Sequence, residues 1–302
     1  MSSPPSTHHT TRPLDAIAAA IVVVLCLSWG FNQVAVKLAI HDIPPLTQAA
    51  IRSVVATLIV AGWCRLRGIP LLARDGTLLP GLAAGLAFGI EFICIYQGLA
   101  YTTATRAVLF IYLAPFIVVL GARVFLPADR FSPAQWLGLC LSFVGMLVAF
   151  GLPTPALDPR QMLGDILMIA GALGWATTTL IIKTSRLNKV SPEKVMLYQL
   201  VISAPMLAIA AWIAGEQLTQ MPSALALGSL AYQTVWVVSV TFVVWFWIIK
   251  NYSANRVSAF TFLTPLFGVA AGHLVLGEPL TPAFAAAVAL VAGGLVLVNR
   301  TR

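Results

Sequence analysis

Apolar residues fill most of the chain in long runs, and charges, proline and glycine gather in the short segments between them. The runs do not alternate between apolar and polar positions, as the strands of a membrane barrel must. A helix needs about 20 residues to cross the hydrocarbon core of a bilayer. Ten runs have roughly this length, and they predict membrane-spanning helices at 15–40, 44–64, 78–100, 104–126, 133–151, 162–185, 192–214, 223–248, 255–276 and 282–299. The pattern therefore predicts an all-α integral membrane protein.

Composition supports a surface that faces lipid. Hydrophobic residues make up 59% of the chain and charged residues only 9%, with a mean hydropathy of +0.92. Soluble domains carry about 25% charged residues. The segments between the runs are too short for a catalytic domain outside the membrane. Residues 1–14, which are rich in Ser, Thr and Pro, are expected to form a disordered cytoplasmic tail.

The basic residues indicate the orientation of the chain. The net charge is +8, but Lys and Arg lie in the gaps between apolar runs and not on one amphipathic face, so no nucleic-acid partner is expected. Fourteen of the 18 lie in the two tails and the even-numbered gaps. Because cytoplasmic loops carry an excess of Lys and Arg, both termini are predicted to be cytoplasmic.

Two stretches of the first half recur in the second half. The segment 27-LSWGFNQVAVK-37 matches 173-LGWATTTLIIK-183, and 103-TATRAVLFIYLAPF-116 matches 253-SANRVSAFTFLTPL-266. Each half contains five predicted spans, and five is odd, so the second half must enter the membrane with the opposite polarity. This predicts an inverted repeat with halves at 15–151 and 162–299, an arrangement typical of secondary transporters. The alternative is a set of chance matches between helices rich in Leu and Ala.

These motifs resemble those of a known family. The L-x-W-G pattern with a Lys closing the first span, the A-T-x-A start of the fourth span, and 276-LGEPLTP-282 are similar to the EamA family of the drug/metabolite transporter superfamily. The first half departs from the pattern, because 126-LPADRFSP-133 lacks an acid at the position of Glu278. The resemblance implies ten spans in two inverted halves. It also implies a bacterial inner-membrane exporter of the amino acid branch, which includes aromatic amino acid exporters.

The first and sixth predicted helices each carry a polar stripe beside a Trp, at helical spacing. Its members are Trp29, Asn32, Gln33 and Val36 in the first helix, and Trp175, Thr178, Thr179 and Ile182 in the sixth. Polar side chains within a membrane face other helices or a water-filled cavity. We expect the two stripes to line a central site near the midplane of the bilayer. The alternative is that these residues only join helices by hydrogen bonds.

The third predicted helix carries one acidic residue, Glu91, within its apolar run. The sequence indicates that this is the only acid deep within a span. An isolated charge in this place needs a proton, a partner or water. Arg52 in the second helix lies at a similar depth, about 12 Å from the helix end at 1.5 Å rise per residue. The pair predicts either a structural ion pair or a site for protons or for the ammonium group of a substrate.

Aromatic, proline, glycine and lysine positions complete the predicted site and its surroundings. Aromatic side chains that could stack on a substrate are Tyr96, Tyr112, Tyr232 and Trp236, whereas Trp245 and Trp247 are expected to be interface anchors. Helix kinks, which could act in gating, are predicted at Pro115 and Pro265. Close helix packing is predicted at Gly81, Gly85 and Gly89, and snorkelling to the interface at Lys37 and Lys183.

No catalytic or metal-binding pattern is present in the sequence. The motifs H-E-x-x-H, G-x-S-x-G and Walker A are absent. The four cysteines lie in apolar runs without a C-x-x-C spacing and are typical of small buried residues. We therefore expect no enzyme activity, no cofactor and no metal. An intramembrane enzyme would need several acid–base groups at one depth, and besides Arg52 and Glu91 only His273 is available.

The sequence and the resemblance together predict a secondary transporter that exports amino acids, including aromatic and other apolar ones, by alternating access through a central cavity between the halves. The alternative is an exporter of drugs or other small metabolites on the same scaffold, and a channel would differ by lacking saturable flux. The expected partners are a small-molecule substrate and the lipid bilayer. The expected state is a monomer or a weak homodimer.

Overall fold

The computed structural model describes residues 14–126, 131–152, 158–277, 280 and 282–300. Residues 1–13 and Glu278 lie outside this part, so the predicted disorder of the tail stays a prediction. All secondary-structure elements of the described residues are helices. These are α1 (Ala16–Ala39), α2 (Pro45–Leu66), α3 (Leu78–Tyr101), α4 (Ala104–Ile111), α5 (Ala114–Phe125), α6 (Pro133–Phe150), α7 (Pro159–Thr184), η2 (Arg186–Lys189), α8 (Pro192–Ile213), α9 (Ala224–Ala231), η3 (Tyr232–Thr241), α10 (Phe242–Asn251), α11 (Ala254–Phe260), α12 (Leu263–Leu276) and α13 (Ala283–Asn299).

The predicted all-α membrane architecture is confirmed. Nine helical segments of the described chain are long and apolar enough to span a bilayer, and α13 is a tenth apolar helix of 17 residues. Three spans are built from consecutive elements: α4 with α5, α9 with η3 and α10, and α11 with α12. The predicted ends agree with the observed ends to within a few residues. The largest deviations include α7, which begins at Pro159 and not at residue 162.

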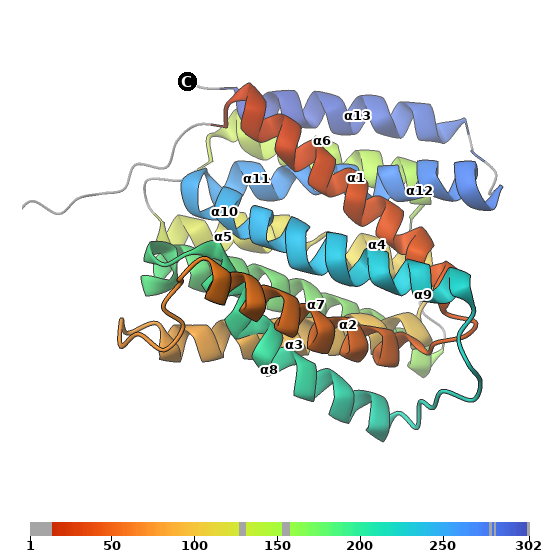
Figure 1. Cartoon of the computed structure of the whole chain (residues 1–302). Coiled ribbons are helices and arrows are strands. Elements are labelled where there is room, and N and C mark those ends of the chain that lie inside the picture. The colour runs from red at the N-terminus through yellow and green to blue at the C-terminus, as the bar shows by residue number, and fades with distance from the viewer. Residues whose placement is uncertain (1–13, 127–130, 153–157, 278–279, 281, 301–302) are drawn as a thin grey trace, which may run out of the picture.

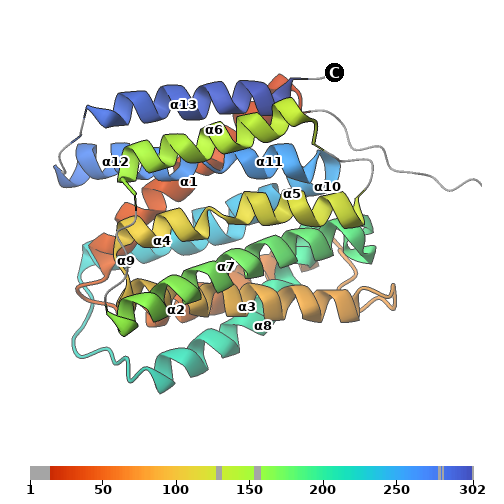
Figure 2. The same cartoon turned by 180° about the vertical axis from the view of Figure 1, so that it is seen from behind.

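The helices form a bundle in which neighbours along the chain are often apart in space. Figures 1 and 2 show α6 and α13 side by side along one edge, with α3 and α8 towards the opposite edge and α1 crossing the bundle obliquely. Close partners from different halves of the chain include α6 with α13, α3 with α7, and α1 with α12. The start of α1 and the end of α13 lie at the same end of the bundle (Figure 1), which is called the terminal end below.

Small residues allow this close packing. A Cβ atom added at Gly81 would lie 2.5 Å from the ring of Tyr198, and one added at Gly85 would lie 2.8 Å from Ile202. At Gly89 the added atom would meet Met206 at 2.6 Å. The predicted close approach of a neighbouring helix is therefore confirmed, and that helix is α8. Without a hydrophobic drive between helices in lipid, contacts of this kind hold the bundle together.

Pro115 and Pro265 each follow a break in their helix, whereas α8 continues without a break through Pro205. Pro115 is the second residue of α5, directly after the break at Tyr112–Leu113, and Pro265 is the third residue of α12, after the break at Thr261–Phe262. Proline lacks an N–H and its ring clashes with the carbonyl four residues earlier, which explains an interruption at this point. The structure places a helix break next to each of these two prolines, and their role as kinks and bending points stays a prediction.

Lys183 does not snorkel to the interface as the sequence predicted. Its side chain is only 5% exposed, and Nζ donates hydrogen bonds to the carbonyl oxygens of Ile249 and Tyr252, both at 2.6 Å. These carbonyls lie at the end of α10, where the last four C=O groups of a helix have no partner within it and the helix dipole favours a cation. Lys183 therefore closes the end of α10, whereas the side chain of Lys37 is exposed at the end of α1.

Candidate functional site

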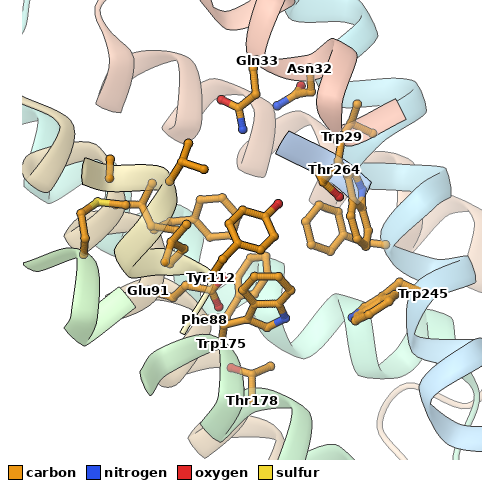
Figure 3. Close-up of a pocket in the computed structure, with 18 of the residues that line it drawn as sticks. Trp29, Asn32, Gln33, Phe88, Glu91, Tyr112, Trp175, Thr178, Trp245 and Thr264 are labelled. Carbon is orange, nitrogen blue, oxygen red and sulfur yellow. The ribbon is translucent and has the colours of Figure 1, made fainter. Parts of the chain in front are cut away.

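A cavity of ≈ 200 Å³ lies between the two halves of the bundle, lined by α1, α2, α3, α4, α7, η3, α10 and α12. Eight of the eleven predicted substrate-binding residues line it: Trp29, Asn32, Gln33, Glu91, Tyr112, Trp175, Thr178 and Thr179. Figure 3 shows most of these side chains converging from different helices, with the Tyr112 hydroxyl directed across the cavity towards Thr264. The two polar stripes of the first and sixth spans are thus brought together, as their spacing predicted.

The wall reaches beyond the middle of the bundle. On α3 it runs from Phe88 to Leu99, close to the C-terminal end of that helix, and on α7 it includes Met168, close to the N-terminal end. Both helix ends lie opposite the terminal end of the bundle. The cavity therefore extends from the middle of the bundle towards the end that is opposite the chain termini.

A carboxyl group and a guanidinium, those of Glu91 and Arg52, line this cavity. Glu91 is 8% exposed and Arg52 is 4% exposed. Within the described chain their charged groups form no direct ion pair, so the contact predicted from their depths is not made, although the two charges are close enough to interact through space. The guanidinium of Arg52 lies over the ring of Phe92, with 4.7 Å from Cζ to the centroid.

Several buried polar atoms of the wall have no hydrogen-bond partner among the described residues. They are Asn32 Oδ1, Arg52 Nε and Thr178 Oγ1. Buried polar groups are usually paired with protein or ordered water, and an exception needs an explanation. Three such atoms around one cavity are suited to a polar ligand or to water that a ligand displaces.

Aromatic rings close the cavity on the side of the terminal end. Trp29 packs edge-on against Trp245, with ring centroids 5.1 Å apart, and its Nε1 donates to Thr241 Oγ1 at 2.8 Å. Phe242 lies 5.6 Å from Trp29 and 5.8 Å from Phe88 between ring centroids. These four rings, Trp29, Phe88, Phe242 and Trp245, are called the aromatic floor below.

Trp245 was predicted to be an interface anchor, and this is wrong, since it is 3% exposed and belongs to the floor. The anchor was predicted from a span that ended at residue 248, whereas the helix continues to Asn251, so Trp245 lies deeper than expected. The sequence also missed Phe242 and Phe246, which line the cavity. They follow the π-helix η3, where i to i+5 hydrogen bonds change how many residues make a turn.

Three predicted substrate-binding residues lie outside the cavity. Trp236 is 42% exposed and its Nε1 donates to Ser28 Oγ at 2.9 Å, while the Tyr232 hydroxyl donates to the Ser28 carbonyl oxygen at 3.0 Å. Both side chains therefore fasten η3 to α1. Tyr96 faces a separate groove between α2, α3 and α8. The positions of Tyr232 and Trp236 give no support for a role at the central site, whereas the ring of Tyr96 lies 5.7 Å from Cζ of Arg52 and contacts the site from outside the cavity.

A buried ion pair that the sequence did not predict lies near the end opposite the termini. Asp165, within the first two turns of α7, accepts hydrogen bonds from Arg106 Nε at 3.0 Å and from Thr102 Oγ1 at 2.7 Å. Arg106 Nη2 also contacts the second carboxylate oxygen. Asp165 lies near the start of its span, whereas Glu91 was predicted as the only acid deep within a span. This network ties α3 and α4 to α7 and lies outside the wall of the cavity.

No group of three or more His, Cys, Asp or Glu side chains that could hold a metal ion occurs in the part of the chain that the structure describes. All four cysteines are free thiols, and Cys140 is the exposed one. The groups available in the cavity are suited to binding: one guanidinium, one carboxyl group, hydroxyl and amide groups, and aromatic faces.

Comparison with known proteins identifies relatives that are described as transporters or efflux pumps. The model of the EamA-like transporter family matches residues 16–151 and again residues 162–300. A "probable amino-acid metabolite efflux pump" of Salmonella typhimurium is 27% identical over 299 residues, covering 94% of each chain. A protein of the same description from Escherichia coli is 25% identical over 278 residues, covering 88% of each chain.

Two further matches agree with this. An uncharacterized transporter of Bacillus subtilis, YoaV, is 23% identical over 269 residues, covering 86% of this chain and 89% of its own. A solved crystal structure superposes with a TM-score of 0.78 over 93% of this chain and 98% of its own, at 21% identity, which shows a shared fold. Because the family model matches the chain twice and covers most of it, the chain belongs to the EamA-like transporter family and is a membrane transporter, not an enzyme.

Proposed function

We propose that the chain exports amino acids, including aromatic and other apolar ones, across the bacterial inner membrane by alternating access through the central cavity. Two relatives carry a description as amino-acid metabolite efflux pumps, and another, from Escherichia coli, is described as an inner membrane transporter. Export and substrate class come to this chain from those relatives. The cavity itself supplies the independent support.

The observation that carries the proposal is the pair of separated charges. A zwitterionic amino acid has an ammonium group for Glu91 and a carboxylate for Arg52, and it would neutralise both charges at once. A guanidinium is well suited to a carboxylate because its N–H groups match the two oxygens. Asn32 Oδ1 and Thr178 Oγ1, which lack partners among the described residues, supply further hydrogen-bonding capacity.

The remainder of the cavity suits an apolar or aromatic side chain. The aromatic floor and the ring of Trp175 offer faces and edges on which a ring could stack. The volume of ≈ 200 Å³ is below the range of about 300–1,000 Å³ typical of pockets for drug-sized ligands. This difference favours an amino acid over the alternative substrate class of drugs or larger metabolites.

The inverted repeat is part of the proposal. The family model matches two segments that nearly coincide with the proposed halves 15–151 and 162–299. Thr102 and Tyr252 occupy corresponding positions at an offset of 150, and each donates a hydroxyl hydrogen bond to an Asp, Asp165 and Asp15 respectively. These two bonds lie at opposite ends of the bundle, as an inverted relationship requires.

Orientation follows from the charge bias. With both termini in the cytoplasm, the cavity would extend towards the outer face, and the aromatic floor would separate it from the cytoplasm. This conformation is then an outward-facing one. Loading from the cytoplasm requires the floor to part, so Trp29 and Trp245 are the residues that we expect to separate during the transport cycle.

Reconstituted proteoliposomes test the substrate class directly. Vesicles loaded with one unlabelled amino acid should accumulate a labelled aromatic amino acid by counterflow, and the rate should saturate with concentration. Amines and carboxylic acids that carry the same side chain should compete poorly, because each satisfies only one of the two charges. Efficient transport of apolar cationic drugs with no counterflow of amino acids would contradict the proposal, and flux that does not saturate would indicate a channel.

A further inference from the structure

A second pocket, with a volume of ≈ 480 Å³, lies at the terminal end of the bundle, away from the central cavity. It is basic, because three arginines line it and no acidic side chain of the described residues does. Its wall includes Arg123, Arg256, Arg300, Phe131, Gln135 and Trp136. We refer to it as the basic pocket.

Each of the three arginines stands at the end of a helix. Arg123 is in the last turn of α5, Arg256 is in the first turn of α11, and Arg300 directly follows α13. Helix ends of a membrane protein lie at the level of the lipid headgroups, where phosphate groups are found. The three charges therefore surround one pocket at the depth of the phosphates.

No carboxylate among the described residues neutralises the charges of the basic pocket. None of the three arginines forms an ion pair within the described part of the chain. The contrast with Arg106 is informative, because the internal repeat equates it with Arg256, and Arg106 is paired with Asp165. Like charges gathered around one pocket repel one another, so an anion from outside the chain would stabilise this arrangement.

The surroundings of the pocket favour a lipid over a soluble anion. Phe131 and Trp136 pack edge to face in the wall, with ring centroids 6.4 Å apart, and aromatic side chains of this kind are typical of the membrane interface. Large exposed hydrophobic side chains lie beside the pocket residues in the chain: Val124 and Phe125 follow Arg123, and Leu137 follows Trp136. A headgroup in the pocket would leave its acyl chains beside this apolar surface.

The wall is also held in place. Gln135 is buried, its Nε2 donates to the carbonyl oxygen of Val298 at 2.9 Å, and its Oε1 accepts from the backbone N–H of Ser132 at 2.9 Å. These bonds fix the start of α6 against the end of α13. A preformed pocket loses less entropy on binding than one that must be ordered first.

We propose that the basic pocket binds the phosphate headgroup of an anionic phospholipid. The bound headgroup joins α5, α11 and α13 at the terminal end of the bundle. Basic pockets between membrane helices are suited to anionic headgroups in general. This site is separate from the central cavity, and its existence does not depend on which substrate the cavity takes.

Native mass spectrometry of the purified full chain in a neutral detergent tests the proposal. The protein is titrated with short-chain phosphatidylglycerol, short-chain phosphatidylcholine or inorganic phosphate. The triple variant Arg123→Gln/Arg256→Gln/Arg300→Gln should bind phosphatidylglycerol about 100-fold more weakly, at about 5-fold for each arginine lost. Binding of phosphatidylcholine should be weak in both proteins and should not change.

The matched control removes three other arginines from the same end of the bundle. Arg65, Arg67 and Arg74 lie at the end of α2 and in the segment before α3, outside the basic pocket. The variant Arg65→Gln/Arg67→Gln/Arg74→Gln loses the same net charge, and its affinity for phosphatidylglycerol should stay within about 2-fold of the original protein.

The other outcomes overturn the proposal. An equal loss in both triple variants would mean general attraction by the charged end, and no loss in either would mean that the pocket is empty of lipid. Inorganic phosphate that binds as tightly as phosphatidylglycerol would make a soluble anion the ligand. If the pocket triple variant does not fold, the single variant Arg256→Gln decides, with an expected loss of about 5-fold.

Discussion

Replacing Glu91 with Gln should weaken the binding of amino acids by roughly 10- to 100-fold, because a hydrogen bond to a charged group contributes about 1.5–3 kcal/mol. Gln keeps the size and the hydrogen-bonding capacity of the side chain and removes only the charge that would meet the substrate ammonium. The measurement is competition in the counterflow assay, with affinities for an aromatic amino acid compared between the variant and the original protein.

The specific signature is the response to analogues. An analogue without the amino group should bind weakly to the original protein and lose nothing further in the Glu91→Gln variant. The variant Arg52→Gln should show the same behaviour towards an analogue without the carboxylate. Such non-additive losses identify groups that contact each other. A change of Gln97, which is on α3 but faces the separate groove, to Leu should leave both affinities unchanged.

The charged pair would not be the zwitterion site if the Glu91→Gln variant lost affinity equally for analogues with and without the amino group. In that case Glu91 would act through the shape or stability of the cavity. Unchanged affinity for every compound would contradict its place at the site altogether.

Replacing Asp165 with Ala should lower the free energy of unfolding by about 3–5 kcal/mol, because it leaves the guanidinium of Arg106 buried without its carboxylate. Both side chains of the pair are more than 90% buried, with exposed fractions of 8% and 9%. The loss is measured by reversible unfolding of the purified protein in mixed micelles. Substrate affinity of the folded fraction should not change, since Asp165 lies outside the cavity wall.

Asp158 provides the matched control on the same helix. Its exposed side chain accepts a hydrogen bond from the backbone N–H of Arg160 at 3.0 Å and caps the start of α7. Asp158→Ala should cost about 0.5–2 kcal/mol, as usual for the loss of such a cap. An apolar replacement of the whole pair, Arg106→Met/Asp165→Leu, should recover most of the stability. Equal losses for Asp158→Ala and Asp165→Ala would contradict a special role for the buried pair.

The sequence predicted the spans because lipid imposes one simple rule, an apolar helix of sufficient length between polar segments. It also predicted eight of the residues that line the cavity, because α1 and α7 are regular helices on which a stripe such as Trp29, Asn32 and Gln33 keeps its spacing. Small residues at Gly81 and its neighbours indicated close packing but not its partner. That partner, α8, depends on tertiary contacts.

The misses have physical causes. Tyr232 and Trp236 do share a face, but it meets Ser28 of α1 and not the cavity. Trp245 lies deeper than predicted because α10 continues to Asn251. Tyr96 lies five residues after Glu91, which turns an α-helix by about 140° from the same face. The pair of Arg106 and Asp165 joins residues far apart in the chain, and one sequence alone gives no signal for such a pairing. Lys183 donates hydrogen bonds to carbonyl oxygens at the end of α10, which lies far from it in the chain, and the sequence gives no signal for this contact.

Accessibility of Gln33 tests most directly whether the cavity holds the substrate and opens to both sides in turn. Its exposed side chain lines the cavity, and Gln33→Cys is introduced after Cys140 is replaced by Ser. Leu72→Cys, which is 97% exposed in the segment between α2 and α3 at the terminal end, marks one side of the membrane. The account predicts that impermeant thiol reagents label Gln33→Cys from either side during turnover, that an aromatic amino acid protects it, and that Leu72→Cys is labelled from the cytoplasm only. Labelling of Gln33→Cys from one side alone, with no protection by substrate, would contradict the account.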